Sequence, residues 1–235
     1  MRDLLLRGAA LALAAAATSA AAADSRHPLV IELFQSQGCS SCPPANANLV
    51  AWARRDDAIA LNFAVDYWDA LGWKDTFAKP EFTARQSAYA RALGHGEVYT
   101  PQAIVNGRAD VTGADAAELA ALTEREDRGA GGPEAAIEGG AARIGAGAAP
   151  VGGADVWLAR YDPVIREVVV KRGENAGRRL PHVDIVTDLV RLGRWRGAAE
   201  RFELPPKPDP RLVDAVIVQA AGNGPILAAV KDSPE

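Results

Sequence analysis

The chain has 235 residues, of which 49% are hydrophobic and 24% charged, and its formal net charge is −4. This composition is typical of a folded globular protein, which excludes a disordered chain, a collagen and a polytopic membrane protein. The acidic balance leaves no basic excess to neutralise phosphates, so no nucleic-acid partner is expected. The length allows one large domain or two small ones.

Residues 1–23 have the pattern of a secretory signal peptide. Arg2 and Arg7 give a positive start, a Leu- and Ala-rich stretch follows, and small residues precede Asp24. The apolar run is shorter than the ~20 residues needed to cross a bilayer. We therefore expect an exported protein, periplasmic or secreted, that has no integral membrane span once the signal peptide is removed.

Residues 24–128 alternate short apolar runs with helical patterns. Strands are expected over 27–34 and 59–65, with a helix that begins at the two prolines after the second cysteine. This strand–helix–strand order predicts a parallel pair with a right-handed crossover. Farther along, the sequence predicts a helix over 80–93, a hairpin over 98–112 around Asn106-Gly107, and a helix over 115–126.

Beyond residue 128 the pattern changes. Residues 129–153 are dominated by Gly and Ala, and they are expected to form a domain linker, weak edge strands or a mixture of the two. Residues 154–235 contain short apolar runs separated by turn sequences. They predict a small antiparallel β domain with strands over 156–161, 166–171, 183–192, 201–204, 215–220 and 226–230.

The only two cysteines lie three positions apart in Cys39-Ser40-Ser41-Cys42. Exported proteins usually use disulfides to join distant parts of a chain, and a bridge this short restrains little chain entropy. The pair also lies where a helix is expected to begin, and unpaired N–H groups there favour a thiolate. The motif therefore favours redox chemistry, with an inert local disulfide as the alternative.

Four segments together resemble a known family. They are ELFQSQGCSSCPP at 32–44, VDYWDALGWKD at 65–75, YTPQ at 99–102 and GENAGR at 173–178. The family is an uncharacterised group of secreted bacterial thioredoxin-like proteins with a Gly-Cys-Ser-Ser-Cys-Pro-Pro motif. The resemblance implies an α/β fold with a thioredoxin-like domain over 24–128, followed by the β-rich domain over 154–235. It does not imply a reaction, because the family has none assigned.

Within this frame, Cys39 is expected to be the exposed nucleophile and Cys42 the resolving thiol. Pro101 is expected, by the resemblance, to follow a cis bond from Thr100 and to face the disulfide, while the neighbouring backbone binds the substrate chain. The alternative is a trans proline at the start of a strand.

An aromatic stretch follows the second expected strand. Because the carboxyl ends of parallel strands open on the same edge of a sheet, this stretch should lie beside the cysteines. Tyr67, Trp68, Asp69 and Trp73 either form a wall that selects the partner or pack an extra helix onto the sheet. We assign Tyr67 and Trp68 to the site and Trp73 to the core.

The leading hypothesis is a thiol–disulfide oxidoreductase that acts on protein thiols or disulfides without a bound cofactor or metal. One alternative is a copper(I)-handling protein, in which His95 is the extra ligand available near Pro101. Another is a binding module that uses the β domain, where residues 173–178 are either a recognition loop or a Gly-rich turn. Glu32 is either a proton relay for the resolving thiol or a structural carboxylate. The direction of electron flow and the oligomeric state stay open.

Overall fold

The structure is a computed structural model that describes residues 22–232. The signal peptide expected over 1–23 therefore lies outside the described residues, apart from its last two positions. Within residues 22–232, no helix is both long enough and apolar enough to cross a membrane.

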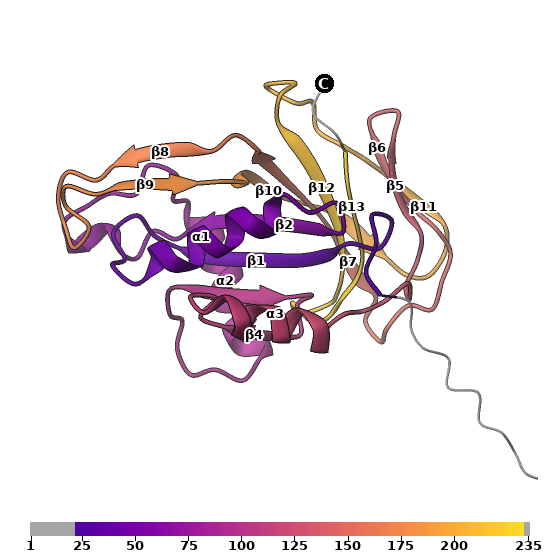
Figure 1. The fold of residues 1–235 in the computed structure, drawn as a ribbon. Helices are drawn as coiled ribbons and strands as arrows, with labels where there is room; N and C mark the ends of the chain where they lie inside the picture. The colour runs from indigo at the N-terminus through magenta and orange to yellow at the C-terminus, as the bar shows by residue number, and fades with distance from the viewer. Residues whose placement is uncertain (1–21, 233–235) are drawn as a thin grey trace, which may run out of the picture.

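One eight-stranded mixed sheet runs through the molecule, and its helices are few (Figure 1). Its strand order is β13-β12-β7-β10-β2-β1-β3-β4. These strands are β1 (Leu29–Gln35), β2 (Ala58–Ala64), β3 (Gln102–Val105), β4 (Ala109–Val111), β7 (Ala154–Asp162), β10 (Ile185–Trp195), β12 (Val213–Ala220) and β13 (Ile226–Lys231). The helices are α1 (Cys42–Ala53), α2 (Pro80–Ala92), α3 (Ala116–Arg125) and a short 3-10 helix, η1 (Asp69–Leu71).

The N-terminal strands pair as the sequence predicts. β1 and β2 are parallel, and β3 runs antiparallel to β1 on its other side. All seven residues of β1 are buried, because α1 and α3 cover one face of the strand and α2 the other. The β3–β4 turn is made by Asn106 and Gly107, which both have a positive φ, as a tight hairpin requires.

The C-terminal strands continue the same sheet. β7 is antiparallel to both of its neighbours, β10 and β12, whereas β10 pairs with β2 in parallel where Ile185 lies opposite Asn62. The small antiparallel β region is therefore present, but its strands share a sheet with β1 and β2. The division at residues 129–153 into two separate domains stays a prediction.

The Gly/Ala-rich segment contains a hairpin. β5 (Ala135–Glu138) and β6 (Ala141–Ile144) form a three-stranded sheet with β11 (Glu200–Glu203). Ala142, Ile144 and Phe202 of this sheet pack with Trp195 and the strands β7 and β12 in a third hydrophobic cluster.

A second small sheet consists of β8 (Arg166–Val169) and β9 (Arg179–His182). This β8–β9 hairpin lies between β7 and β10 in the chain and packs along α1 (Figure 1). β9 does not follow from the sequence pattern, because Pro181 lies within its four residues and proline weakens a strand pattern.

A buried polar network joins β1 and α2 to the C-terminal strand β12. Arg85 of α2 makes two hydrogen bonds to the Glu32 carboxylate, from Nε (2.5 Å) and Nη2 (2.9 Å). The Tyr89 hydroxyl donates to the same carboxylate at 2.6 Å, and Gln219 of β12 donates to the Tyr89 oxygen at 2.8 Å. Arg85 therefore neutralises a carboxylate that is fully buried in the central strand β1.

Replacing Arg85 with Met should lower the free energy of unfolding by about 3 to 5 kcal/mol, because it leaves the Glu32 charge buried without a partner. Urea denaturation measures this loss. The double variant Glu32→Met with Arg85→Met removes both charges and should unfold at a higher urea concentration than Arg85→Met alone. A double variant that is less stable than the single one would contradict this account.

His182, the last residue of β9, is fully buried, and neither of its ring nitrogens has a hydrogen-bond partner in the described part of the chain. The rings of His182 and Phe77 pack in a T-shaped arrangement, with their centroids 5.8 Å apart. Burial lowers the pKa of His182 from 6.5 to about 4. The histidine is therefore neutral in the folded protein under conditions in which it is charged in the unfolded chain.

Because the unfolded chain binds the extra proton, the contribution of His182 to stability is complete above pH 6.5 and is lost as the pH falls from 6.5 toward 4. At about 1.4 kcal/mol per pKa unit, the loss is roughly 3 kcal/mol. Burial raises the pKa of Asp75 to about 6 and of Asp184 to about 7, which acts in the opposite direction. As the pH is lowered from 6.5 to 4, the free energy of unfolding should therefore fall less, or rise more, in His182→Gln than in the wild type. Urea denaturation measures both, and equal slopes would disprove the assignment.

Candidate functional site

The two cysteines lie at the carboxyl end of β1. The strand ends at Gln35, a turn carries Cys39, and α1 begins at Cys42. The cysteines form a disulfide with a Cα–Cα distance of 5.4 Å. Prolines occupy the first turn of α1, where a missing N–H group leaves no helical hydrogen bond unmade. Of the two serines between the cysteines, Ser41 places its hydroxyl 3.3 Å from Cys39 Sγ.

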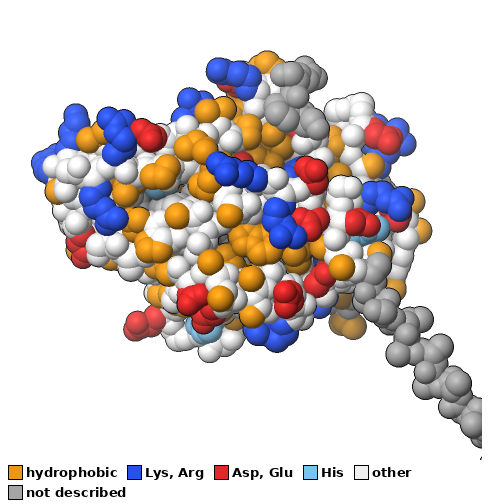
Figure 2. Space-filling model, in the orientation of Figure 1, with side chains coloured by type: hydrophobic (Ala, Val, Ile, Leu, Met, Phe, Trp, Pro, Cys, Tyr) orange, Lys and Arg blue, Asp and Glu red, His pale blue; other side chains and the backbone are white. Residues whose placement is uncertain are grey.

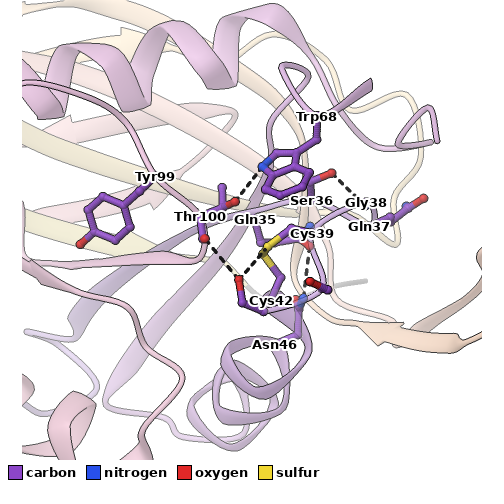
Figure 3. The surroundings of a disulfide bond; sticks show 12 residues. Gln35, Ser36, Gln37, Gly38, Cys39, Cys42, Asn46, Trp68, Tyr99 and Thr100 are labelled. Atoms are coloured by element: carbon purple, nitrogen blue, oxygen red, sulfur yellow. Dashed lines mark hydrogen bonds between the residues drawn. A yellow bond between two sulfur atoms is a disulfide. The ribbon is translucent and has the colours of Figure 1, made fainter. Parts of the chain in front are cut away.

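Three loops meet around this disulfide. The Thr100–Pro101 bond is cis, in agreement with the expectation from the family resemblance, and it lies directly before β3, the antiparallel neighbour of β1. The Ser41 hydroxyl donates to the Thr100 carbonyl oxygen at 3.5 Å. Trp68, from the loop after β2, donates from Nε1 to Thr100 Oγ1 at 2.8 Å. Figure 3 shows the indole beside the disulfide, with Thr100 at its nitrogen.

The aromatic residues divide between the site and its support. Trp68 lies against both the Thr100 loop and the cysteine turn. Its indole binds Thr100, and its Cβ is so close to Gly38 that a Cβ added to this glycine would lie 3.7 Å away. Tyr67 is 36% exposed, and burial of the rest of its ring raises its pKa. Trp73 donates from Nε1 to Gln37 Oε1 at 2.9 Å, so it supports the turn that carries Cys39.

Asp75 also supports this turn, and the sequence analysis did not single it out. Its carboxylate accepts the Gln37 N–H at 2.6 Å and the Phe77 N–H at 2.9 Å. Burial raises its pKa to about 6, against the lowering effect of these hydrogen bonds. A buried carboxyl group with a raised pKa is therefore hydrogen-bonded to Gln37, which lies two positions before Cys39 in the chain.

The tip of the β8–β9 hairpin, residues 173–178, lies on the cysteine turn. Asn175 Nδ2 donates to the carbonyl oxygens of Gln37 (2.9 Å) and Cys39 (2.8 Å). The Ser40 N–H donates to Glu174 Oε2 at 3.2 Å. The sequence of this segment is compatible with either a recognition loop or a Gly-rich turn. It is a turn whose polar side chains bind the residues around the disulfide.

Both sulfur-bearing residues are buried: Cys39 is 0% exposed and Cys42 is 1% exposed. The expectation that Cys39 is exposed toward a partner is therefore wrong for this disulfide state. The physical reason is the convergence of the Trp68–Thr100 contact and the hairpin tip on the same turn. Neither contact is visible from the cysteine motif alone.

Glu32 and His95 have other partners. Glu32 lies with Val30 and Phe34 on the face of β1 that α2 covers, whereas α1 covers the other face, and its carboxylate belongs to the Arg85 network. The structural interpretation of Glu32 is therefore supported. His95 Nε2 lies 2.8 Å from Asp110 Oδ1, and Asp110 also accepts from Tyr99 and Gln102. Across residues 22–232, no three His, Cys, Asp or Glu side chains are grouped as metal ligands usually are.

Three residues that bind the cysteine turn, Asp75, Glu174 and Asn175, are not identified by the cysteine motif but lie in segments that carry the family resemblance. Asp75 ends VDYWDALGWKD, and Glu174 and Asn175 lie in GENAGR. The sequence offered one signal for all three residues: their segments, although remote from the cysteines in the chain, occur together with the cysteine motif. Pattern alone does not show that a hairpin folded from residues 166–182 returns to the start of α1.

Comparisons with known proteins agree with this architecture. A crystal structure of a protein from Agrobacterium tumefaciens, solved as a structural-genomics target, is 35% identical, with a TM-score of 0.72, over 88% of this chain and 94% of that one. HBP35 of Porphyromonas gingivalis matches with a TM-score of 0.58 over 88% of this chain and 75% of that one; at 14% identity this shows a shared fold alone. No curated protein matches the sequence. A family described as protein of unknown function (DUF1223) matches residues 30–219, and this chain belongs to that family.

Proposed function

We propose that this protein is an exported thiol–disulfide oxidoreductase with a thioredoxin-like active-site arrangement. It acts on protein thiols or disulfides through Cys39 and Cys42 and uses no bound cofactor. The observation that carries the proposal is the disulfide between the end of β1 and the start of α1, with Thr100 in contact across the site. A bridge of this span contributes little to stability, so reactivity explains it better.

Three loops supply the parts that disulfide exchange needs. The cysteine turn carries the reactive sulfur atoms, the Thr100–Pro101 loop offers backbone to a partner chain, and Tyr67 and Trp68 form the aromatic side of the site. The Ser41 hydroxyl lies 3.3 Å from Cys39 Sγ, where it donates to a thiolate once the disulfide is reduced. The cis bond at Thr100–Pro101, beside the cysteine turn, supports the roles that the family resemblance implies for these two residues.

The exchange has two steps in either direction. A partner thiolate attacks Cys39 Sγ, the Cys39–Cys42 bond breaks, and Cys42 leaves as a thiolate that takes up a proton. A second partner thiolate then attacks the partner sulfur of the mixed disulfide and releases Cys39, so the partner is oxidised and the protein gains two electrons. In the reverse direction, Cys39 attacks a partner disulfide and Cys42 resolves the mixed disulfide.

Cys42→Ser should accumulate covalent complexes between Cys39 and partner proteins, because the resolving thiol is missing. The measurement is non-reducing electrophoresis of the protein expressed with its signal sequence, followed by mass spectrometry of the bands that dithiothreitol removes. Cys39→Ser is the matched control and should form none. If Cys42→Ser forms no mixed disulfide, the proposed function is wrong.

The reduction potential of the Cys39–Cys42 pair should lie between about −270 and −120 mV, the range of dithiol proteins that exchange electrons with partners. Equilibration with glutathione or dithiothreitol, followed by alkylation and mass spectrometry, gives the value. A potential near the upper end identifies an oxidant and one near the lower end a reductant. A potential well below about −300 mV would identify a structural disulfide.

A further inference from the structure

The hairpin tip, residues 173–178, binds the backbone of the cysteine turn from outside the main sheet. Asn175 donates both amide hydrogens to the turn, to the carbonyl oxygens of Gln37 and Cys39, and its own Oδ1 accepts from Arg178 Nη1 at 2.6 Å. Asn175 is 0% exposed, although its neighbours on both sides in the chain are exposed. A buried amide whose two donors are used on one short turn fixes the backbone of that turn.

Glu174 adds a negative charge at the same place. Its carboxylate accepts the Ser40 N–H at 3.2 Å, and hydrogen bonding by the Ser40 side chain and backbone holds its pKa below the ordinary value. The N–H group that it occupies follows directly after Cys39. Backbone N–H groups at this end of α1 stabilise a thiolate, whereas a nearby carboxylate repels one. Glu174 therefore opposes the formation of a Cys39 thiolate.

We propose that residues 173–178 form a cap that holds the Cys39–Cys42 disulfide closed, with Asn175 as its positioning residue and Glu174 as its charge. This inference rests on the proposed redox function of the same cysteines. By fixing the carbonyl groups around Cys39, Asn175 keeps the two sulfur atoms close and so favours the disulfide over the dithiol. A protein thiol reaches Cys39 only after the cap has released the turn.

The hairpin is built in a way that permits this release. β8 and β9 form a separate two-stranded sheet, so opening the tip breaks no hydrogen bond of the eight-stranded sheet. Within the tip, Gly173 and Gly177 have a positive φ, which lets the chain turn sharply there. Five cationic side chains of this segment are exposed: Arg166, Lys171, Arg172, Arg178 and Arg179. Blue side chains gather at the left end of Figure 2, where Figure 1 places the β8–β9 hairpin.

Asn175→Leu keeps most of the side-chain volume and removes all three hydrogen bonds. We expect its disulfide to be reduced by dithiothreitol about tenfold faster, with an equilibrium constant shifted about tenfold toward the dithiol, which is about 30 mV less negative. Dithiothreitol supplies both electrons: one thiolate attacks a cysteine sulfur, the Cys39–Cys42 bond breaks, and the second thiol closes the cyclic disulfide. If this variant is reduced at the wild-type rate and has the wild-type reduction potential, the proposed cap is wrong.

Arg178→Met provides a second test of the cap in case Asn175→Leu does not fold. Arg178 is exposed, and the substitution removes only the donor that holds Asn175 Oδ1. Its disulfide should be reduced several-fold faster than that of the wild type, because Asn175 is then held by fewer contacts. An unchanged rate in a folded Arg178→Met variant would count against Asn175 as the positioning residue.

Glu174→Gln tests the charge separately, because glutamine still offers an oxygen to the Ser40 N–H. In the reduced protein it should lower the pKa of Cys39 and so raise the thiolate fraction about twofold to threefold at low salt, as followed by thiolate absorbance. The difference should shrink in 1 M salt, where the Debye length is about 3 Å, whereas the effect of Asn175→Leu should persist. An unchanged Cys39 pKa at low salt would remove Glu174 from the proposal.

Glu167→Gln is the matched control, because Glu167 lies in the same hairpin and pairs with Arg179 instead of the cysteine turn. It should leave both the rate and the potential unchanged. All these measurements use the isolated full chain and a small reductant, so they do not depend on a protein partner. Trapping by Cys42→Ser tests the proposed function independently, and either idea can therefore fail while the other stands.

Discussion

The pairing of β10 with β2 is the contact on which the arrangement of the site depends. Ile185 lies opposite Asn62, and the Asn62 N–H donates to the Asp184 carbonyl oxygen at 2.9 Å. This parallel contact joins the C-terminal strands to the sheet that carries the disulfide. Because the β8–β9 hairpin precedes β10 directly, the same contact also places the hairpin along α1, with its tip at the start of the helix. Remote sequence segments thereby meet at one turn.

Elements with strong local signals could be predicted from the sequence. The apolar run of β1, the prolines at the start of α1 and the Asn106-Gly107 turn each determine their own local structure, so their positions follow from short-range physics. The edge at which Cys39, Trp68 and Thr100 meet follows from strand direction. β9 could not be predicted, because Pro181 weakens its strand pattern. The union of the sheet could not be predicted either, because it depends on the pairing of Ile185 with Asn62, more than a hundred positions away in the chain.

The candidate site shows the same limit. The cysteine motif identifies the reactive atoms, but their burial depends on Trp68 and Asn175, which arrive from separate loops. Asn175 has no signal of its own, since an asparagine in a Gly-rich turn is common in any protein. The side chains that accept the Gln37 and Ser40 N–H groups of this turn, Asp75 inside and Glu174 outside, are both acidic. This contrasts with the electropositive surroundings that usually activate a cysteine.

The place of the hairpin in the β7–β10 connection has a consequence for the design of this fold. Asp162, the last residue of β7, pairs directly with Ile185, the first residue of β10, so the two strands meet as an antiparallel pair whatever lies between them. Residues 163–184 thus form the connection of a strand hairpin, the kind of position where chain length changes most easily. A relative with a short turn at this point would keep the pairing of β7 with β10 and would lack the proposed cap of residues 173–178. Variation in the length of one loop would then convert a guarded disulfide into an open one.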